Sequence, residues 1–249
     1  MSRFCFKSFQ IYQESEKWHE DGRVYLTVFA ILIQCHLHGF LIFQGSTRPP
    51  LMPAVDNMKD HLETKLLAIL DGHPWFMAAL DAVSELGLSQ WCIGAGVIRN
   101  IVFDYLDGGT PTPIRDVDVA YFDPSALSEH KDREYEDTLI FRMPNIPWEV
   151  TNQAAIHLWY HKKFGYRVSP VNGIEQAVAT WPETCTAVGV TKVHKDEYKV
   201  YAPCGLEDLF GMVIRRNPTR VDIQTYNARI LNKQYDQYWK SVTVINEKG

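Results

Sequence analysis

Residues 91–123, WCIGAGVIRNIVFDYLDGGTPTPIRDVDVAYFD, decide how this chain is expected to fold. The apolar residues 91–93 predict a short strand that runs into the bend Gly94-Ala95-Gly96. Residues 97–108 have the apolar spacing of a helix, which is expected to end at Gly108. After the proline-containing loop 110–115, the alternating residues 116–122 predict a second strand. The segment is therefore expected to form a strand, a tight bend, a helix and a strand.

Asp116 and Asp118 lie two residues apart on the second predicted strand. Both carboxylates are therefore expected on one face of the sheet, while Val117 and Val119 face the core. Paired carboxylates on a rigid strand suit Mg²⁺ or Mn²⁺, which prefer oxygen ligands and leave positions open for substrate phosphates. Two such ions can activate an attacking hydroxyl and neutralise a leaving pyrophosphate. Asp116 and Asp118 are the predicted metal ligands.

The small residues Gly94, Ala95 and Gly96 are candidates for binding a nucleotide. A bend with little side chain lets a triphosphate approach backbone N–H groups and the start of the next helix, which attract negative charge. Arg99 follows the bend and could hold a phosphate with its planar guanidinium, or form a structural salt bridge. A dinucleotide-binding fingerprint is excluded, because Arg99 stands where its third glycine is required.

The same span resembles the head of the DNA polymerase β-like nucleotidyltransferases, in which a small glycine turn is followed by Asp-x-Asp. Residues 95–100 are similar to the Gly-Gly-x-Val-Arg-Asp segment of tRNA CCA-adding enzymes, with Ala95 and Asn100 replacing its first glycine and its aspartate. More closely, the chain resembles a bacterial family of predicted nucleotidyltransferases. The motifs of that family stand here at residues 91–100, 116–123, 152–154, 181–190 and 202–210.

This resemblance covers about residues 65–240 and implies an α/β (α+β) fold. It implies a polymerase β-like core with a mixed sheet and flanking helices. The implied reaction moves an NMP from an NTP such as ATP to a hydroxyl acceptor by a two-metal Mg²⁺ mechanism. The acceptor, whether RNA, a protein or a small molecule, is not implied.

The superfamily pattern also calls for a third carboxylate on a neighbouring strand, which would accept the proton of the acceptor hydroxyl and complete the metal site. Glu149, in the strand-like residues 147–150, is the candidate, with Asp123 and Glu136 as alternatives. An exposed strand glutamate or a helix cap is the structural alternative for Glu149. Asn152 is expected either to contact the base or ribose or to cap the next helix.

Two other classes of function compete with this interpretation. One is a non-catalytic nucleotide-binding module with a degenerate nucleotidyltransferase fold, whose third acid would be lost. The other is a zinc hydrolase, because His157 and His161 have the i, i+4 spacing of a metal pair on a helix. Neither a Glu-based zinc motif nor an evident third ligand accompanies these histidines.

Composition narrows the remaining possibilities. Charged residues make up 22% of the 249 residues and the net charge is −5, which argues against a broad basic face that coats duplex nucleic acid. The five cysteines are odd in number and widely spaced, which is typical of reduced thiols in a cytoplasmic protein.

Residues 1–55 differ from the rest and are interpreted as an N-terminal extension of uncertain structure, followed by a nucleotidyltransferase domain over residues 56–242. The apolar run 24–43 is long enough to span a bilayer. Thr27, Gln34, His36 and His38 interrupt it, so a membrane anchor is the less favoured interpretation. A further alternative is that translation begins at Met52 or Met58.

Several later elements are also predicted. Residues 151–163 are expected to form a helix capped by Thr151, and residues 184–193 and 198–203 are expected to form strands joined by a turn. Two terminal helices are expected around residues 205–215 and 221–239, with Arg215 and Arg216 at the end of the first.

Overall fold

The computed structural model describes the backbone of residues 55–247, with side chains from Met58 onward. The predicted extension lies outside the described residues, apart from Val55, and so does its apolar run 24–43. Among the described residues no single helix could cross a membrane by length and apolar character. The helical residues 58–71 and 74–84 are long and apolar enough only when they are taken as one span, and the two helices are bent by 100° at the break between them.

A mixed sheet of five strands, in the order β3-β2-β1-β4-β5, forms the centre of this part of the chain. β2 and β3 run parallel, and the other neighbours are antiparallel. The fold class predicted from the sequence is thereby confirmed. The strands are β1 (Trp91–Gly94), β2 (Val117–Tyr121), β3 (Trp148–Asn152), β4 (Gly189–His194) and β5 (Glu197–Tyr201).

Helices cover the sheet and bury its apolar side chains. Leu66 of α1, Phe76 of α2 and Phe103 of α3 are fully buried in one core with Ile93 of β1 and Val117 of β2. Burial of large apolar side chains removes them from water, which is the main stabilising contribution here. The helices are α1 (Val55–Asp71), α2 (Pro74–Ser84), α3 (Gly96–Asp107), α4 (Glu129–Arg142), α5 (Ile156–Phe164) and α6 (Ile174–Val178).

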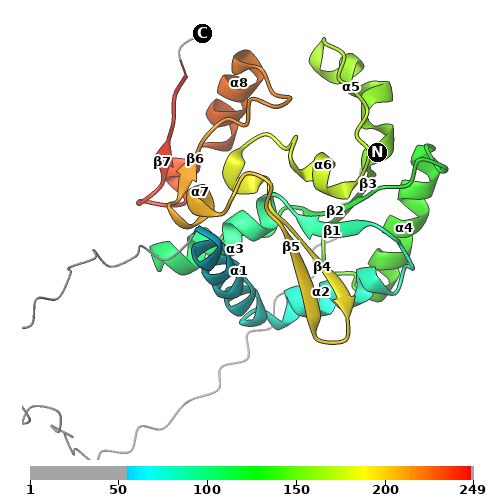
Figure 1. Ribbon diagram of the computed structural model, residues 1–249, viewed down its shortest axis with the longest axis horizontal. Helices are drawn as coiled ribbons and strands as arrows, with labels where there is room; N and C mark the ends of the chain where they lie inside the picture. Colours follow the sequence, from blue (N-terminus) through cyan, green and yellow to red (C-terminus); the bar gives the residue numbers. More distant parts are fainter. Residues whose placement is uncertain (1–54, 248–249) are drawn as a thin grey trace, which may run out of the picture. The chain divides into compact units, whose positions relative to one another are not determined.

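The C-terminal elements gather beside α3 (Figure 1). The indole Nε1 of Trp239 donates a hydrogen bond of 2.7 Å to Asp104 on α3, and the Tyr226 hydroxyl donates to the carbonyls of Ile214 and Ile245. Residues 206–244 therefore pack into the same core as α3, through Leu206, Leu209, Tyr226 and Trp239. These elements are α7 (Glu207–Phe210), β6 (Val213–Ile214), α8 (Ile223–Lys233) and β7 (Thr243–Val244).

The structure corrects two predictions for the middle of the chain. Thr151 does not cap a helix, because it pairs with Ala120 inside β3; the Asn152 side chain instead caps the short 3₁₀ turn Gln153–Ala155. Residues 184–186 form a second 3₁₀ turn rather than a strand, and β4 begins only at Gly189. At Thr151, pairing with β2 outweighs local propensity, whereas residues 184–186 are held in their turn by hydrogen bonds to Glu183.

Both predicted terminal helices are shorter than expected. Helix α7 ends at Phe210, Met212 has a positive φ of 53°, and β6 follows, so Arg215 and Arg216 do not end a helix. Helix α8 ends at Lys233 with Gln234 in the left-handed conformation, and a 3₁₀ turn over Tyr235–Gln237 continues the chain. Left-handed residues commonly end helices.

Candidate functional site

Three carboxylates line one cavity beside β2 and β3. Asp118 of β2 pairs in register with Gly94 of β1 on one side and with Glu149 of β3 on the other, and Asp116 lies two residues earlier along the chain. Residues that pair in register point to the same face of a sheet. Asp116, Asp118 and Glu149 accordingly line one cavity of about 320 Å³, here named the carboxylate cavity.

The electrostatics of this cavity favour a bound cation. Burial, followed by the negative charges of Asp116 and Glu149, raises the pKa of Asp118 to about 7, although Arg229 and Lys233 oppose the shift. A divalent cation would relieve this crowding of negative charge. Oxygen donors of this kind fit Mg²⁺ or Mn²⁺.

Within residues 55–247, no three His, Cys, Asp or Glu side chains are grouped closely enough to hold a metal by themselves. This finding leaves the zinc alternative without a ligand set, since His157 and His161 gain no third partner.

The predicted bend is strained at Ala95. This residue has φ 58° and ψ −125°, a conformation that a residue with a Cβ rarely adopts, and it precedes α3 directly. Its backbone N–H donates to the carbonyl of Val188 at 3.0 Å. A Cβ built on Gly96 would lie 3.9 Å from the Asp116 carboxylate. Ala95 and Gly96 both line the carboxylate cavity, so the bend lies beside the acids.

Gly94 does not line the cavity. A Cβ at this position would lie 2.6 Å from the carbonyl of Val188 and 2.7 Å from the ring of Trp181, so only glycine fits. The structure therefore gives Gly94 a packing role, where the sequence suggested a nucleotide contact.

Arg99 points into the cavity although it is only 5% exposed. Its Nε and Nη2 donate to the Asn100 side chain at 3.0 and 2.7 Å, and its guanidinium lies 4.9 Å from the ring centre of Tyr235. Its Nη1 is buried and has no hydrogen-bond partner. Buried donors are almost always paired, so this nitrogen marks a place for a missing acceptor.

Asn152 lies away from the cavity and is 1% exposed. Its side-chain amide donates to the carbonyls of Asp123 and Ala126, and its oxygen accepts from the N–H groups of Asp123 and Ala154. These bonds occupy the hydrogen-bonding capacity of the amide, so the structure supports the capping alternative for Asn152. The next residue, Gln153, lines the cavity instead.

Helix α8 contributes cations that the sequence interpretation did not include. Arg229 and Lys233 both line the carboxylate cavity. They are four residues apart and share one face of the helix, which was the available signal in the sequence. Burial, and then the charge of Arg229, lowers the pKa of Lys233.

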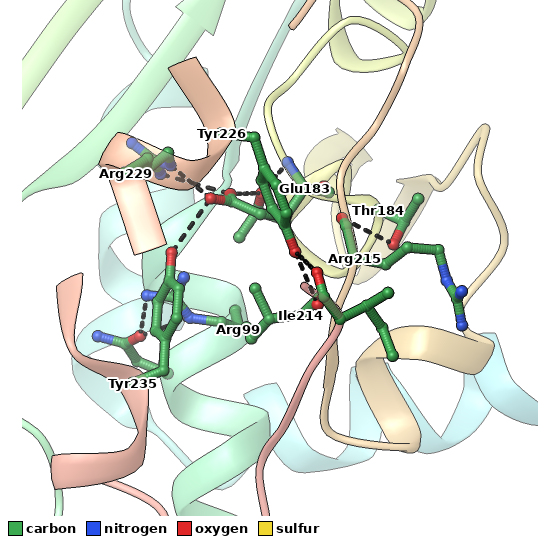
Figure 2. Close-up of polar contacts among 11 residues, drawn as sticks. Arg99, Glu183, Thr184, Ile214, Arg215, Tyr226, Arg229 and Tyr235 are labelled. Atoms are coloured by element: carbon green, nitrogen blue, oxygen red, sulfur yellow. Dashed lines mark hydrogen bonds and ion pairs between the residues drawn. The ribbon is translucent and has the colours of Figure 1, made fainter. Parts of the chain in front are cut away.

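A fully buried carboxylate holds Arg229 in place. Glu183 accepts hydrogen bonds from the Arg229 guanidinium, from the Tyr235 hydroxyl at 3.1 Å and from the Thr186 hydroxyl at 2.8 Å (Figure 2). Burial alone would raise the pKa of Glu183, but the charge of Arg229 holds it below its ordinary value. Glu183 thereby fixes both Arg229 and Tyr235 at the cavity wall.

Comparisons with known proteins show the family and the fold of the chain. A family described as nucleotidyltransferase matches residues 81–244, well over half of the chain. A solved NMR structure described as a CCA-adding enzyme head domain is similar with a TM-score of 0.63 and 27% identity. The match covers 74% of this chain and 96% of that one.

A second solved structure, a CCA-adding enzyme in an apo form, is similar with a TM-score of 0.42 and 12% identity. That match covers 73% of this chain and 42% of the enzyme, and a likeness of this level adds no weight. A search of curated proteins found no match. The family match includes the bend, all three carboxylates and α8, and the chain therefore belongs to the nucleotidyltransferase family.

Proposed function

We propose that the protein transfers an NMP group from a Mg²⁺-bound NTP to a hydroxyl acceptor at the carboxylate cavity. The supporting observation is that Asp116, Asp118 and Glu149 line the same cavity as Arg99, whose buried Nη1 has no hydrogen-bond partner. Arg99 would thus be satisfied by an anionic oxygen, and the three carboxylates by a cation. A nucleoside triphosphate with its divalent metal supplies both.

Each residue has a role in this proposal. Arg99 and the bend at Ala95 and Gly96 bind the triphosphate, with the N-terminus of α3 directed at its charge. Asp116 and Asp118 hold the metal, which when bound neutralises phosphate charge and lowers the pKa of an attacking hydroxyl.

Glu149 is exposed and lies beside Asp118, where it can accept the proton of the acceptor hydroxyl. The acceptor oxygen then forms a bond to the α-phosphorus. The bond from that phosphorus to the β-bridging oxygen breaks, and its electron pair leaves with pyrophosphate. Arg229 and Lys233 are placed to stabilise the negative charge of the phosphates.

The proposal is tested with Asp116→Asn, which keeps the shape of the side chain and removes its charge. With Mg²⁺, each α-labelled NTP and a cell extract, the wild type should label an acceptor and release pyrophosphate. The variant should lose both by about 100-fold or more while its thermal unfolding stays cooperative.

Asp123→Asn is the matched control, because Asp123 lies at the end of β2 outside the cavity and accepts hydrogen bonds from Ser125. Its activity should equal that of the wild type. If Asp116→Asn kept most of its activity, the assignment would be wrong. Stabilisation by NTP and Mg²⁺ without pyrophosphate release would instead favour the non-catalytic nucleotide-binding module.

A further inference from the structure

A second, larger hollow opens next to the carboxylate cavity. Its volume is about 790 Å³, and it shares Glu149, Trp181 and Lys233 with the carboxylate cavity. Its walls come from α5 and α8, which Figure 1 shows on either side of the segment that carries α6. We name it the α5–α8 groove. Since Glu149 lies on both hollows, a molecule in the groove could present a hydroxyl to the proposed base.

The α5 wall of the groove is aromatic. Trp159, Tyr160 and Phe164 all line it, with ring centres 6.3 Å apart for the first pair and 4.3 Å apart for the second. Trp159 and Phe164 are partly exposed, so part of each ring remains accessible to a ligand. Aromatic rings at the edge of a groove are platforms on which flat rings of a ligand stack.

The groove is also positively charged. Lys163, Arg220, Arg229 and Lys233 line it. Arg229 is paired with Glu183, whereas the other three take part in no ion pair within the described part of the chain. Lys163 and Arg220 lie over the rings of Phe164 and Tyr160, each 5.6 Å from the ring centre. Glu149 is the sole acidic side chain on its lining. This local excess of positive charge stands out against the net charge of −5 for the whole chain. Unpaired cations of this kind favour an anionic ligand.

We infer that the α5–α8 groove binds the single-stranded end of a polynucleotide, whose terminal sugar hydroxyl lies at Glu149. Bases stack on the α5 rings, while phosphates contact Lys163 and Arg220. The inference rests on the proposed function, and it names the acceptor of that reaction. In the transfer, the terminal hydroxyl oxygen bonds to the α-phosphorus, its proton passes to Glu149, and pyrophosphate leaves.

Strand binding can be measured without NTP or metal. Fluorescence anisotropy of the full chain with labelled RNA and DNA strands of about ten nucleotides should show binding, and weaker binding to a duplex of the same sequence. Trp159→Ala should weaken strand binding about tenfold, because one stacked base is lost. Phe141→Ala is the control, since Phe141 is 89% exposed on α4 and lies outside the groove.

A variant that removes only a surface charge tests strand binding without disturbing side-chain packing. Lys163 is exposed, so Lys163→Gln should leave the fold intact and lower the slope of log affinity against log salt by about 0.7. The same change at Lys195, an exposed residue of the β4–β5 turn, should leave the slope unchanged. The inference would be overturned if strand and duplex bound equally well. It would also be overturned if neither Trp159→Ala nor Lys163→Gln changed strand binding.

The outcomes separate this inference from the proposed function. Strand binding that requires the groove residues, with no pyrophosphate release on adding NTP and Mg²⁺, supports the groove and contradicts nucleotidyl transfer. Pyrophosphate release with a protein or small molecule as acceptor, and no strand binding, overturns the groove inference and leaves nucleotidyl transfer standing.

Discussion

Ala95 shows how a single residue can store strain at the site. Its left-handed φ of 58° is one that glycine adopts freely, and such strained positions concentrate where function depends on them. The strained residue lies in the bend between β1 and α3, which lines the same cavity as Asp116. A glycine at this position would give the same bend at lower cost in the folded state.

We expect Ala95→Gly to stabilise the protein by about 1 kcal/mol, because relief of backbone strain exceeds the added entropy of the unfolded chain. Urea unfolding measures the change. The same replacement at Ala79, buried in the middle of α2, should destabilise by about 1 kcal/mol. A loss of stability at both positions would show that Ala95 is not strained.

The pKa of Asp118 predicts how the stability of the metal-free protein depends on pH. Its pKa rises from 3.8 to about 7 on folding, so the folded state holds its proton more tightly than the unfolded chain. The charge therefore destabilises the fold above pH 7, and this cost disappears as pH falls toward 4.

Asp118→Asn should consequently be more stable than the wild type at pH 8 in EDTA, with the difference vanishing near pH 4. Thermal unfolding across this range measures it. Asp123→Asn should show the opposite sign at pH 8, because hydrogen bonds from Ser125 lower the pKa of Asp123 and favour its charged form. A gain for Asp118→Asn that does not depend on pH would contradict this explanation.

At the scale of elements, the parallel pairing of β2 with β3 decides which acid stands beside Asp118. The register places Glu149 there, while the other candidates lie elsewhere. Glu136 on α4 accepts a hydrogen bond from the Val150 N–H at 3.2 Å, and Asp123 accepts from Ser125. A shift of one residue in this pairing would turn Glu149 to the other face of the sheet.

Glu149→Gln should lower turnover about 100-fold or more, with little change in the affinity for Mg²⁺–NTP, because it removes the proposed base but not the proposed metal ligands Asp116 and Asp118. Steady-state rates and nucleotide titrations measure the two effects. Glu136→Gln is the control and should retain its turnover. Equal losses in the two variants would remove the catalytic role from Glu149.

At the scale of the whole molecule, the Glu183–Arg229 pair joins residues 46 positions apart and ties α8 to the centre of the fold. Glu183 is fully buried, whereas Arg229 reaches the cavity. A charged group buried without its partner is costly, whereas an apolar replacement of both partners is often tolerated. The placement of Arg229 therefore depends on its contact with Glu183, in a distant part of the sequence.

Arg229→Met should lower the free energy of unfolding by about 3 kcal/mol, since Glu183 is left buried without its cation. The double variant Glu183→Gln/Arg229→Met should recover much of this loss, and a double-mutant cycle from urea unfolding measures the coupling. Thr186→Val, which removes one hydrogen bond to Glu183, should cost about 1 kcal/mol. If the changes in unfolding free energy for Glu183→Gln and Arg229→Met simply added up in the double variant, the two residues would not be coupled.

The sequence by itself determined the elements whose signals are local. The period of two placed Asp116 and Asp118 on one face, and the bend with its following helix was readable from residues 94–108, because these features depend on neighbours within a few positions. It also carried the family motifs. Local signals failed at Thr151, where pairing with β2 prevailed. They also failed at residues 184–186, where hydrogen bonds to the buried Glu183 form a turn in place of the expected strand.

Only the tertiary structure decided which side chains share the cavity. Register placed Glu149 beside Asp118, close packing against Val188 and Trp181 surrounds Gly94, and α8 brought in Arg229 and Lys233. These are distances between residues that lie far apart in the chain. They follow from how the buried faces of helices and strands fit together, and no pattern of neighbouring residues encodes that fit.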